Sequence, residues 1–464
     1  MTRESGLTAG IILAAGEGTR MRSSRPKVLH KLAGKTFLER VMASVTALDP
    51  GLTAVVVHFQ AEKVAAAARS YDDRVRIVQQ DDRPGTGRAV QCAMDQLDRS
   101  LDPDGYVLIA ASDMPLLDTN TLRGLIDHHI QAGDGATVLT VSLDDPTGYG
   151  RIIRDQDGRV LRIVEQKDAT GTELAVREVN TSVYVFNVDV LRQAIKGLKD
   201  SNAQGEFYLT DALETARQSG TVGAFTAPDP LSVEGVNDRV QLASLSKKHN
   251  IRVCHELMRS GVTILDPETT WIEDGVTIEP DATILPGCFL QGQTTIASNA
   301  TVGPYTTLID AVIDQDATVE RSRVQETHIG ARANIGPWTY MRPGNDLAED
   351  SKAGAFVEMK KAKIDHGTKV PHLSYVGDTH IGHDSNIGGG SITANYDGVH
   401  KNRTEIGSGV HVGAGNLFVA PVQVGDRVTT GAGTVIRHEV PDDAMVYSTN
   451  DQHTVEDWKP EWER

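Results

Sequence analysis

The sequence predicts two architectures in one chain: an α/β domain with a mostly parallel sheet, followed by a parallel β-helix. Two patterns lead to this prediction. Short aliphatic runs alternate with helical patterns over residues 8 to about 236, and beyond about residue 260 aliphatic residues recur every six positions. Composition agrees, since 464 residues that are 39% hydrophobic and 23% charged are typical of a globular protein with two or three domains.

The first half, which we place at residues 1–236, alternates strands with amphipathic helices, as a layered α/β domain requires. One predicted helix shows its buried face in Leu38, Val41, Val45 and Leu48, which recur at steps of three and four residues. The predicted strands are Gly10–Ala15, Ala54–His58, Arg76–Gln80, Tyr106–Ala111 and Ala136–Ser142.

A helical linker is predicted over residues 237–259, because this stretch lacks Gly and Pro and repeats apolar residues at helical spacing. The β-helix domain follows at residues 260–464. Its repeat of six is even, so in an extended chain every marked residue points to the same side and stacks on its equivalent one coil away. The longest series are Ile272, Ile278, Ile284, Leu290, Ile296, Val302 and Leu308, and later Ile406, Val412, Phe418, Val424, Thr430 and Ile436.

Two segments depart from the repeat of six. Residues 388–405 do not keep its phase, and we expect a loop that leaves the coil; a neutral surface insertion is the alternative, and a functional loop is favoured because it holds Asn395, Tyr396 and Lys401. The repeat is expected to stop after Pro441. The polar tail from about residue 441 carries Trp458 and Trp462, which we expect to dock against a neighbouring surface.

Charge and cysteine usage limit the function classes. Lys and Arg number 46 against 63 Asp and Glu, a net charge of −17, which disfavours nucleic-acid and anionic-membrane partners. No apolar run approaches the roughly 18 residues of a membrane span. Three widely spaced cysteines, Cys92, Cys254 and Cys288, are typical of free thiols in a reducing compartment. We therefore expect a cytoplasmic protein.

A Gly-rich and basic segment, Leu13–Lys27, follows the first predicted strand. Glycines let backbone amides approach a phosphate chain, and Arg20, Arg22, Arg25 and Lys27 would neutralise it. The segment is neither the dinucleotide fingerprint nor a P-loop. Taken alone, a strand-to-helix turn with solvated arginines would be the better interpretation.

Further motifs change that interpretation, because together they resemble a known family. The chain is similar to the bacterial bifunctional N-acetylglucosamine-1-phosphate uridyltransferases and glucosamine-1-phosphate acetyltransferases, and the resemblance covers nearly the whole chain. It implies a Rossmann-like nucleotidyltransferase domain and a left-handed parallel β-helix of hexapeptide repeats. The motifs are LAAGEGTRM with the later PK, GTG at 85–87, SDMPLL at 112–117, PTGYGRI at 146–152, IVEQKDA at 163–169, EVNTSVYVF at 178–186 and EGVNDR at 234–239.

The resemblance implies a uridyltransferase site in the first half. Asp113 and Asn237 would bind Mg²⁺, a hard cation suited to one carboxylate, one amide oxygen and substrate phosphates. The alternative for Asp113 is a helix N-cap after Pro115; its place at the end of a strand favours the metal. Binding of UTP is assigned to Leu13, Ala14, Ala15, Gly16, Arg20, Lys27, Gln80, Gly85 and Thr86, and binding of N-acetylglucosamine 1-phosphate to Gly150, Glu165, Asn180 and Asn237.

In the second half the resemblance implies an acetyltransferase. His372 would be the general base, because the ammonium of glucosamine 1-phosphate must lose a proton before it attacks the thioester of acetyl-CoA. Glu358 would orient its imidazole, whereas a surface histidine is the alternative for His372. The remaining implied residues are Arg342, Lys360, Tyr375, Asn386 and Lys401 for the amino-sugar phosphate, and Gly389, Asn395, Tyr396, Ala414 and Ala432 for acetyl-CoA.

Several positions depart from the family's pattern. Pro84 and Arg88 replace Leu and His, and Ala111-Ser112 replaces a Tyr-Gly pair, near the expected nucleotide contacts. Ala414 stands where Ser is frequent, and Thr449 where a basic residue is frequent. Nucleotide selectivity and coenzyme A affinity are the properties these changes touch.

Other histidines are given no site. His380 and His383 lie on opposite faces of an extended chain, which argues against a metal site, and we expect His128 and His129 to be solvated on a helix.

The resemblance thus implies a bifunctional enzyme of UDP-N-acetylglucosamine synthesis, and also a homotrimer formed through the β-helix, with acetyltransferase sites between subunits. Two alternatives stay open: a single-activity sugar-1-phosphate nucleotidyltransferase with a structural or regulatory β-helix, and a non-catalytic sugar-nucleotide binder.

Overall fold

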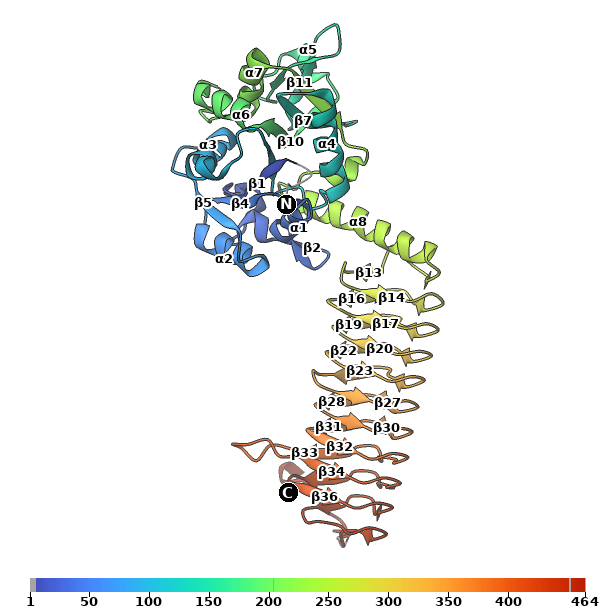
Figure 1. Ribbon diagram of the computed structural model, residues 1–464. Helices are drawn as coiled ribbons and strands as arrows, with labels where there is room; N and C mark the ends of the chain where they lie inside the picture. Colours follow the sequence, from blue (N-terminus) through green and yellow to red (C-terminus); the bar gives the residue numbers. More distant parts are fainter. Residues whose placement is uncertain (1–5, 203, 450–451, 464) are drawn as a thin grey trace. The chain divides into compact units, whose positions relative to one another are not determined.

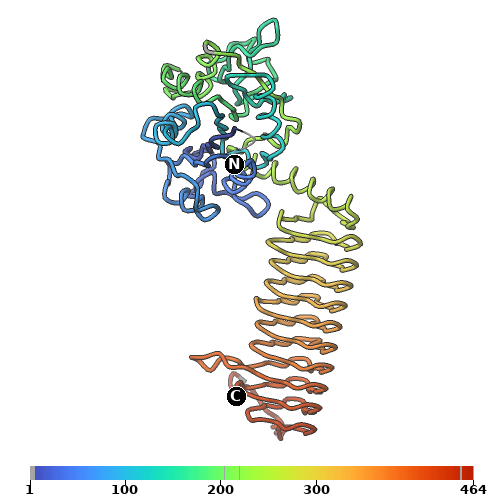
Figure 2. Tube along the Cα trace, viewed as in Figure 1, coloured from blue at the N-terminus to red at the C-terminus, as the bar shows by residue number. Residues whose placement is uncertain are grey.

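The computed structural model describes residues 6–202, 204–449 and 452–463. Their contacts divide the chain into two compact units, with the boundary between Lys248 and His249. Figures 1 and 2 show helices around a sheet in the first unit and a stack of flat coils in the second. Within the described ranges, no helix combines the length and apolar character needed to cross a membrane.

A mixed sheet of nine strands forms the centre of the first unit, in the order β11-β7-β10-β6-β1-β4-β5 with a β8-β9 hairpin beside β10. Strands β1, β4, β5 and β6 run parallel, and β10 is antiparallel to β6 and β7. All five predicted strands form, with ends shifted by a few residues. The bounds are β1 Leu7–Leu13, β4 Leu52–Val57, β5 Arg76–Gln79, β6 Tyr106–Ala111, β7 Ala136–Ser142, β8 Arg151–Arg154, β9 Val160–Val164, β10 Glu178–Asn187 and β11 Val222–Thr226.

Helices cover both faces of this sheet, so its aliphatic strands are buried on two sides. Ile11 and Val56 pack toward α3, α6 and α7, whereas Ile12 and Val55 pack toward α1, α2 and α4. This three-layer arrangement is why the strands read as nearly continuous aliphatic runs. The helices are α1 Phe37–Thr46, α2 Ala61–Tyr71, α3 Thr86–Leu97, α4 Thr119–Ala132, α5 Gly171–Leu174, α6 Val188–Ala194 and α7 Thr210–Ser219.

Helix α1 begins at a capping box. The Thr36 hydroxyl accepts from the Glu39 amide at 3.1 Å, and the Glu39 carboxylate accepts from the Thr36 amide at 2.6 Å. Its buried face contains Leu38, Val41 and Val45 as predicted, whereas Leu48 lies beyond the end of the helix.

The prediction that His128 and His129 are solvated is wrong. His129 is 1% exposed, and its ring nitrogens lie 2.8 Å from the Thr137 hydroxyl and 3.0 Å from the amide oxygen of Asn187. Burial lowers the pKa of His129. His128 is half-buried and packs against the ring of Phe225.

Helix α8 (Arg239–Arg259) occupies most of the predicted linker. In its first part Leu245 is buried in the first unit. In its second part Asn250 caps the start of the β-helix: its amide donates to the Thr270 carbonyl at 2.7 Å, and its oxygen accepts from the Ile272 amide at 2.9 Å. Cys92, Cys254 and Cys288 are buried, and none forms a disulfide.

The second unit is a parallel β-helix with three faces, each a sheet of parallel strands from successive coils. The first face contains β12 Thr263–Ile264, β15 Thr283–Ile284, β18 Thr301–Val302, β21 Thr318–Val319, β24 Asn334–Ile335, β27 Lys352–Ala355 and β30 Lys369–His372. The second contains β13 Trp271–Ile272, β16 Phe289–Gln291, β19 Thr307–Ile309, β22 Arg323–Gln325, β25 Tyr340–Met341, β28 Glu358–Lys360, β31 Tyr375–Gly377, β33 Ile392–Ala394, β35 Leu417–Val419 and β38 Val435–Ile436. The third contains β14 Thr277–Ile278, β17 Thr295–Ile296, β20 Val312–Ile313, β23 His328–Ile329, β26 Asp346–Leu347, β29 Lys363–Ile364, β32 Thr379–Ile381, β34 Thr404–Ile406 and β36 Val422–Val424.

The residues of the sixfold series form the interior column of this β-helix. Ile284 aligns with Val302, and Leu290 aligns with Leu308, each one coil further along the chain. Every residue of the two long series is buried, Thr430 included. The periodic prediction is therefore confirmed, because stacking of equivalent aliphatic residues supplies the core of the unit.

The two segments predicted to depart from the repeat are shorter in the structure than the sequence indicates. Residues 388–391 stay in the coil and 392–394 form β33, so only residues 395–403 leave it, before β34 resumes at Thr404. The repeat also continues past Pro441, since β39 (Met445–Val446) pairs with β37 (Thr429–Thr430). In both places, glycine-rich and polar turns obscure the phase of the six-residue repeat in the sequence. Trp458 and Trp462 are 62% and 85% exposed.

Candidate active sites

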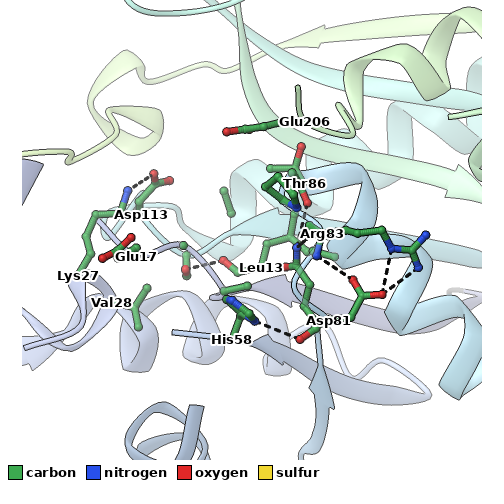
Figure 3. A pocket seen from close by; sticks show the side chains of 18 of the residues that line it. Leu13, Glu17, Lys27, Val28, His58, Asp81, Arg83, Thr86, Asp113 and Glu206 are labelled. Atoms are coloured by element: carbon green, nitrogen blue, oxygen red, sulfur yellow. Dashed lines mark hydrogen bonds and ion pairs between the residues drawn. The ribbon is translucent and has the colours of Figure 1, made fainter. Parts of the chain in front are cut away.

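A cavity of about 460 Å³ opens at the carboxyl ends of the parallel strands β1, β5 and β6. Open α/β sheets bind ligands at this edge, and the volume is in the range of small-molecule sites. Figure 3 shows Lys27 and Asp113 on one side of the cavity and Asp81 and Arg83 on the other. Its lining includes Leu13, Ala15, Gly16, Lys27, Gln80, Gly85, Thr86, Ala111, Ser112 and Asp113.

The Gly-rich segment forms two short 3-10 turns, Thr19–Met21 and Lys27–Leu29, beside this cavity. A Cβ added to Gly16 would have no other atom within 4 Å, so a ligand can approach the backbone on that side. Gly18 has a φ of 66°, and a Cβ there would lie 2.6 Å from Cβ of Lys27. Ala14 is buried and Arg20 points to Asn237, so neither lines the cavity.

The ammonium group of Lys27 contacts two oxygen-bearing side chains. Its Nζ lies 2.7 Å from Oδ2 of Asp113 and 3.2 Å from Oδ1 of Asn237, and Arg20 Nη2 donates to the same Asn237 oxygen at 3.0 Å. Asp113 is no N-cap, because Asp118 caps α4. One carboxylate and one amide oxygen converge on a single cationic group, and this donor set fits Mg²⁺.

A tightly tied loop connects β5 to α3. The Gln80 amide donates to the Arg83 carbonyl at 2.8 Å, and Gly85 has a φ of 114°. The Asp81 carboxylate accepts from Arg83 at 2.8 Å and from Arg88 at 2.6 Å. These hydrogen bonds, first from Arg88 and then from Arg83, hold the pKa of Asp81 below its usual range. The departure at position 88 therefore acts on the loop and not on the cavity, which Arg88 does not line.

Two other positions that depart from the family's pattern, Pro84 and Ser112, also lie close to the cavity or its strands. Pro84 lines the cavity, and its carbonyl accepts from the Phe207 amide at 3.0 Å. Ser112 is buried, and its hydroxyl donates to the Leu13 carbonyl at 2.6 Å, which ties the end of β6 to the end of β1.

Gly150, Glu165 and Asn180 lie together beside β8, β9 and β10. The Asn180 amide donates to the Gly150 carbonyl at 2.9 Å, and a Cβ on Gly150 would lie 3.3 Å from a Glu165 carboxylate oxygen. Burial raises the pKa of Glu165, although Thr210 donates to it at 3.4 Å. The side chain of Asn180 donates to the Tyr184 hydroxyl at 2.8 Å.

On the second face of the β-helix, three cations lie close together. Arg342 follows β25, Lys360 ends β28, and the loop places Lys401 beside Lys360. The direct interaction with the Lys401 ammonium, burial of the amine and the nearby charge of Arg342 lower the pKa of Lys360. Neighbouring like charges need an anion, so the cluster suits a phosphate.

His372 ends β30 on the first face and is exposed. Among the described residues, no hydrogen bond or ion pair joins it to Arg342, Lys360 or Glu358. The expectation that Glu358 orients its imidazole fails within one chain, since Glu358 Oε1 pairs with Arg342 Nη1 at 3.1 Å. The two groups occupy different faces of the coil.

Small residues stack above His372 at one corner of the coils. Gly390 donates to the His372 carbonyl at 3.3 Å, Gly415 donates to Gly389 at 2.8 Å, and Gly433 donates to Ala414 at 2.8 Å. A Cβ on Gly389 would lie 3.3 Å from that of His372. Gly389, Ala414 and Ala432 thus lie on successive coils along a corner without bulky side chains, and Asn386 lies in the same coil as Gly389.

Tyr375, Asn395 and Tyr396 lie at or near the base of the loop. The Asn395 amide donates to Asp378 at 2.5 Å and lies 3.5 Å from the Tyr375 hydroxyl. Tyr396 is 61% exposed and bridges to Lys401 across the loop.

Sequence reasoning missed Asp81, Arg83 and Glu206 as lining residues, and Asp378 as the partner of Asn395. Asp81 and Arg83 carried a signal, because they lie just before the GTG motif that the sequence singled out. Glu206 carried none, since it approaches the cavity from more than a hundred residues further along the chain.

Comparison with known proteins agrees with both halves. Residues 10–168 match the family described as MobA-like NTP transferase domain. Over 458 residues, covering 99% of this chain and 100% of the relative, the sequence is 74% identical to the bifunctional protein GlmU of Bifidobacterium longum strain NCC 2705. It is 50% identical over 455 residues to that of Mycolicibacterium gilvum, covering 97% of this chain and 91% of the relative, and 47% identical over 454 residues to that of Paenarthrobacter aurescens, covering 98% and 91%. By its fold, its motifs and this similarity along both units, the chain belongs to the bifunctional GlmU family.

Proposed function

We propose that this chain acetylates glucosamine 1-phosphate with acetyl-CoA and then couples the N-acetylglucosamine 1-phosphate to UTP, releasing pyrophosphate, in the cytoplasm. The observation that carries the proposal is the separation of two phosphate-binding sets. Lys27 with Asp113 and Asn237 lies in the first unit, and Arg342 with Lys360 and Lys401 lies in the second.

In uridylyl transfer, a phosphate oxygen of the sugar 1-phosphate attacks the α-phosphorus of UTP, and pyrophosphate leaves. This chemistry needs positioning and neutralisation of charge more than covalent participation of the protein. Backbone amides near Gly16 and the ammonium of Lys27 would hold the triphosphate. The base would meet Gln80, Gly85 and Thr86, which all line the cavity. Glu165, Asn180 and Gly150 would hold the sugar.

Mg²⁺ would be held by Asp113 and Asn237, and when bound it would supply positive charge beside the phosphates. Lys27 lies within hydrogen-bond distance of both oxygens, so its ammonium would share the same anionic substrate. Arg20 holds the Asn237 oxygen in this direction.

In acetyl transfer, His372 would take the proton that the amino group loses as its nitrogen attacks the thioester carbon, and coenzyme A would leave as the thiol. Arg342, Lys360 and Lys401 would bind the sugar phosphate, with Tyr375 and Asn386 nearby. Acetyl-CoA would contact Gly389, Asn395, Tyr396, Ala414 and Ala432. Since one chain holds His372 and the cations on different faces, a second copy would complete the site, and we propose a homotrimer.

One assay separates this proposal from its two alternatives. The full-length protein is supplied with acetyl-CoA, glucosamine 1-phosphate, UTP and Mg²⁺, and free thiol and pyrophosphate are recorded independently. A single-activity nucleotidyltransferase would release pyrophosphate only from supplied N-acetylglucosamine 1-phosphate and never release thiol. A non-catalytic binder would release neither.

Two substitutions test the division of labour. We expect His372→Ala to abolish thiol release while sparing pyrophosphate release from supplied N-acetylglucosamine 1-phosphate, and Lys27→Ala to do the reverse. His383→Ala and Lys31→Ala are matched controls, since both residues are exposed and outside either site. Loss of both outputs from either site variant in a folded protein would contradict the proposal.

A further inference from the structure

Glu206 is a charged residue of the first cavity that the proposed function leaves without a task. It precedes α7, lines the cavity and is half-buried. Figure 3 shows its side chain extending over the cavity from the opposite side to His58. No other described residue donates a hydrogen bond to its carboxylate.

The backbone around Glu206 is held firmly. In the covering segment, residues 204–209, the Phe207 amide donates to the Pro84 carbonyl at 3.0 Å and the Phe207 carbonyl accepts from Gly87 at 2.8 Å. A Cβ on Gly85 would lie 2.3 Å from the Phe207 carbonyl oxygen, so the close approach of the two segments requires glycine. The covering segment is therefore attached directly to the loop expected to hold the base.

The backbone amide and carbonyl of Glu206 are both hydrogen-bonded to the side chain of Asn202. The Asn202 amide donates to the Glu206 carbonyl at 2.5 Å, and the Asn202 oxygen accepts from the Glu206 amide at 3.2 Å. These contacts fix the backbone of Glu206, and its side chain extends over the cavity (Figure 3). Because the backbone is already ordered, a ligand group that binds this carboxylate pays less of the entropic cost of ordering the segment.

Glu206 lines the nucleotide cavity and also acts electrostatically on a side chain of the expected sugar subsite. It lines the cavity together with Thr86 and Lys27, and its charge contributes to the raised pKa of Glu165, although burial is the larger cause. The carboxylate therefore lies within electrostatic reach of the side chain assigned to the sugar phosphate.

The chemistry of a carboxylate narrows its ligand. An ionised carboxylate only accepts hydrogen bonds, and it repels phosphate oxygens. The neutral donors that the two substrates offer in greatest number are the hydroxyls of ribose and of the hexose. Repulsion at this end would also direct the phosphates toward Lys27, which lines the cavity.

Resting on the proposed uridylyl transfer, we propose that Glu206 is a specificity-determining residue whose carboxylate accepts a hydrogen bond from a sugar hydroxyl of a substrate. The hydroxyl belongs either to the ribose of UTP or to the hexose of N-acetylglucosamine 1-phosphate. Both hydroxyls would donate the same kind of hydrogen bond to the carboxylate. The substrate analogues used in the test distinguish the two.

The test compares the full-length protein with Glu206→Gln and Glu206→Ala in pyrophosphate release. Each is assayed with UTP, 2′-deoxy-UTP and 3′-deoxy-UTP, and with N-acetylglucosamine 1-phosphate and its 3-deoxy, 4-deoxy and 6-deoxy forms. The wild type should lose kcat/KM by roughly 10- to 100-fold on the analogue that lacks the contacted hydroxyl, as expected for a hydrogen bond to a charged group. In Glu206→Ala that ratio should fall to near one, with an intermediate ratio in Glu206→Gln.

A loss confined to a deoxy-UTP identifies the ribose, and one confined to a deoxy-hexose identifies the sugar phosphate. Equal ratios in wild type and Glu206→Ala for all five analogues would overturn the proposal. Absence of pyrophosphate release by the wild type on natural substrates would instead overturn the proposed function. Glu214→Gln is the matched control, because Glu214 is exposed on α7 and does not line the cavity. The thermal unfolding curve of each variant, compared with that of the wild type, reports whether the first unit is folded.

Discussion

Lys27 and Asp113, 86 residues apart in the sequence, form an ion pair in which Nζ and Oδ2 lie 2.7 Å apart. Both side chains are largely buried at the mouth of the nucleotide-sized cavity, with 12% and 28% of their surface exposed. The pair brings the basic turn after β1 to the end of β6. Because the Asn237 oxygen reaches the same ammonium, the three groups prepare a place where phosphate and cation can meet.

Asp113→Asn should raise the Mg²⁺ concentration needed for half-maximal pyrophosphate release. We expect a shift of about tenfold or more, because even outer partners of a metal site are worth this much in affinity. The measurement is pyrophosphate release titrated with Mg²⁺. Asp127→Asn, on the exposed side of α4, should leave the titration unchanged, and an unchanged titration in Asp113→Asn would exclude this carboxylate as a ligand.

Arg88→His should loosen the loop that carries Gln80, because the bidentate contact of Arg88 with Asp81 is lost. Asp81 is 42% exposed, so solvent weakens the pair, and we expect KM for UTP to rise only about two- to fivefold. KM for N-acetylglucosamine 1-phosphate should stay constant. Arg123→His on α4 is the control; a change in both KM values alike would mean that Arg88 acts on the whole unit.

Lys401→Ala should weaken binding of glucosamine 1-phosphate and return the pKa of Lys360 toward its ordinary value, since the neighbouring ammonium is removed. Loss of one charged hydrogen bond to phosphate predicts a KM increase of about tenfold with a smaller change in kcat. Thiol release at varied sugar phosphate measures both constants. Lys363→Ala, on the third face, is the matched control, and equal effects in the two variants would refute the cation cluster as the binding site.

His328 should make the β-helix more stable at low pH. Its ring nitrogens each lie 2.8 Å from a carboxylate, of Asp314 and of Asp346, and these contacts raise its pKa although burial opposes them. A raised pKa in the folded state contributes stability that is complete below the unfolded pKa of about 6.5 and is lost as pH rises through the folded value. Thermal unfolding of wild type and His328→Gln should differ most at low pH and converge as the pH rises above the folded-state pKa of His328. A difference that grows with pH would show that the contacts of His328 with Asp314 and Asp346 do not stabilise the protonated imidazole.

His129 should have the opposite effect in the first unit. Burial lowers its pKa, so below about pH 6.5 the unfolded chain binds a proton that the folded state excludes. Stability of the first unit should therefore fall as pH falls through this range. His129→Gln should show a shallower fall in melting temperature than wild type, even if it is less stable throughout. Parallel curves would show that His129 does not titrate on unfolding.

Much of the fold could be predicted because its signals are local. The sixfold series from Ile272 to Leu308 marks one buried aliphatic residue on each face of the first coils, and the aliphatic runs mark the strands of the sheet. Prediction failed where the local pattern was silent. His129 shares its helix with polar neighbours, and only the packing of α4 against β7 and β10 buries it. Residues 388–394 stay in the coil although glycines obscure their phase.

The sequence by itself determined the two architectures, the motif residues and the chemical classes they bring, since spacing and residue type are written along the chain. Only the tertiary structure decided which charges face each other. In the folded chain Arg88 pairs with Asp81, Glu358 pairs with Arg342, and Glu206 lies over the cavity. The physical reason is that hydrogen bonds and charge pairs act over a few ångströms of space, and folding brings that distance to residues whose separation in sequence carries no periodic signal.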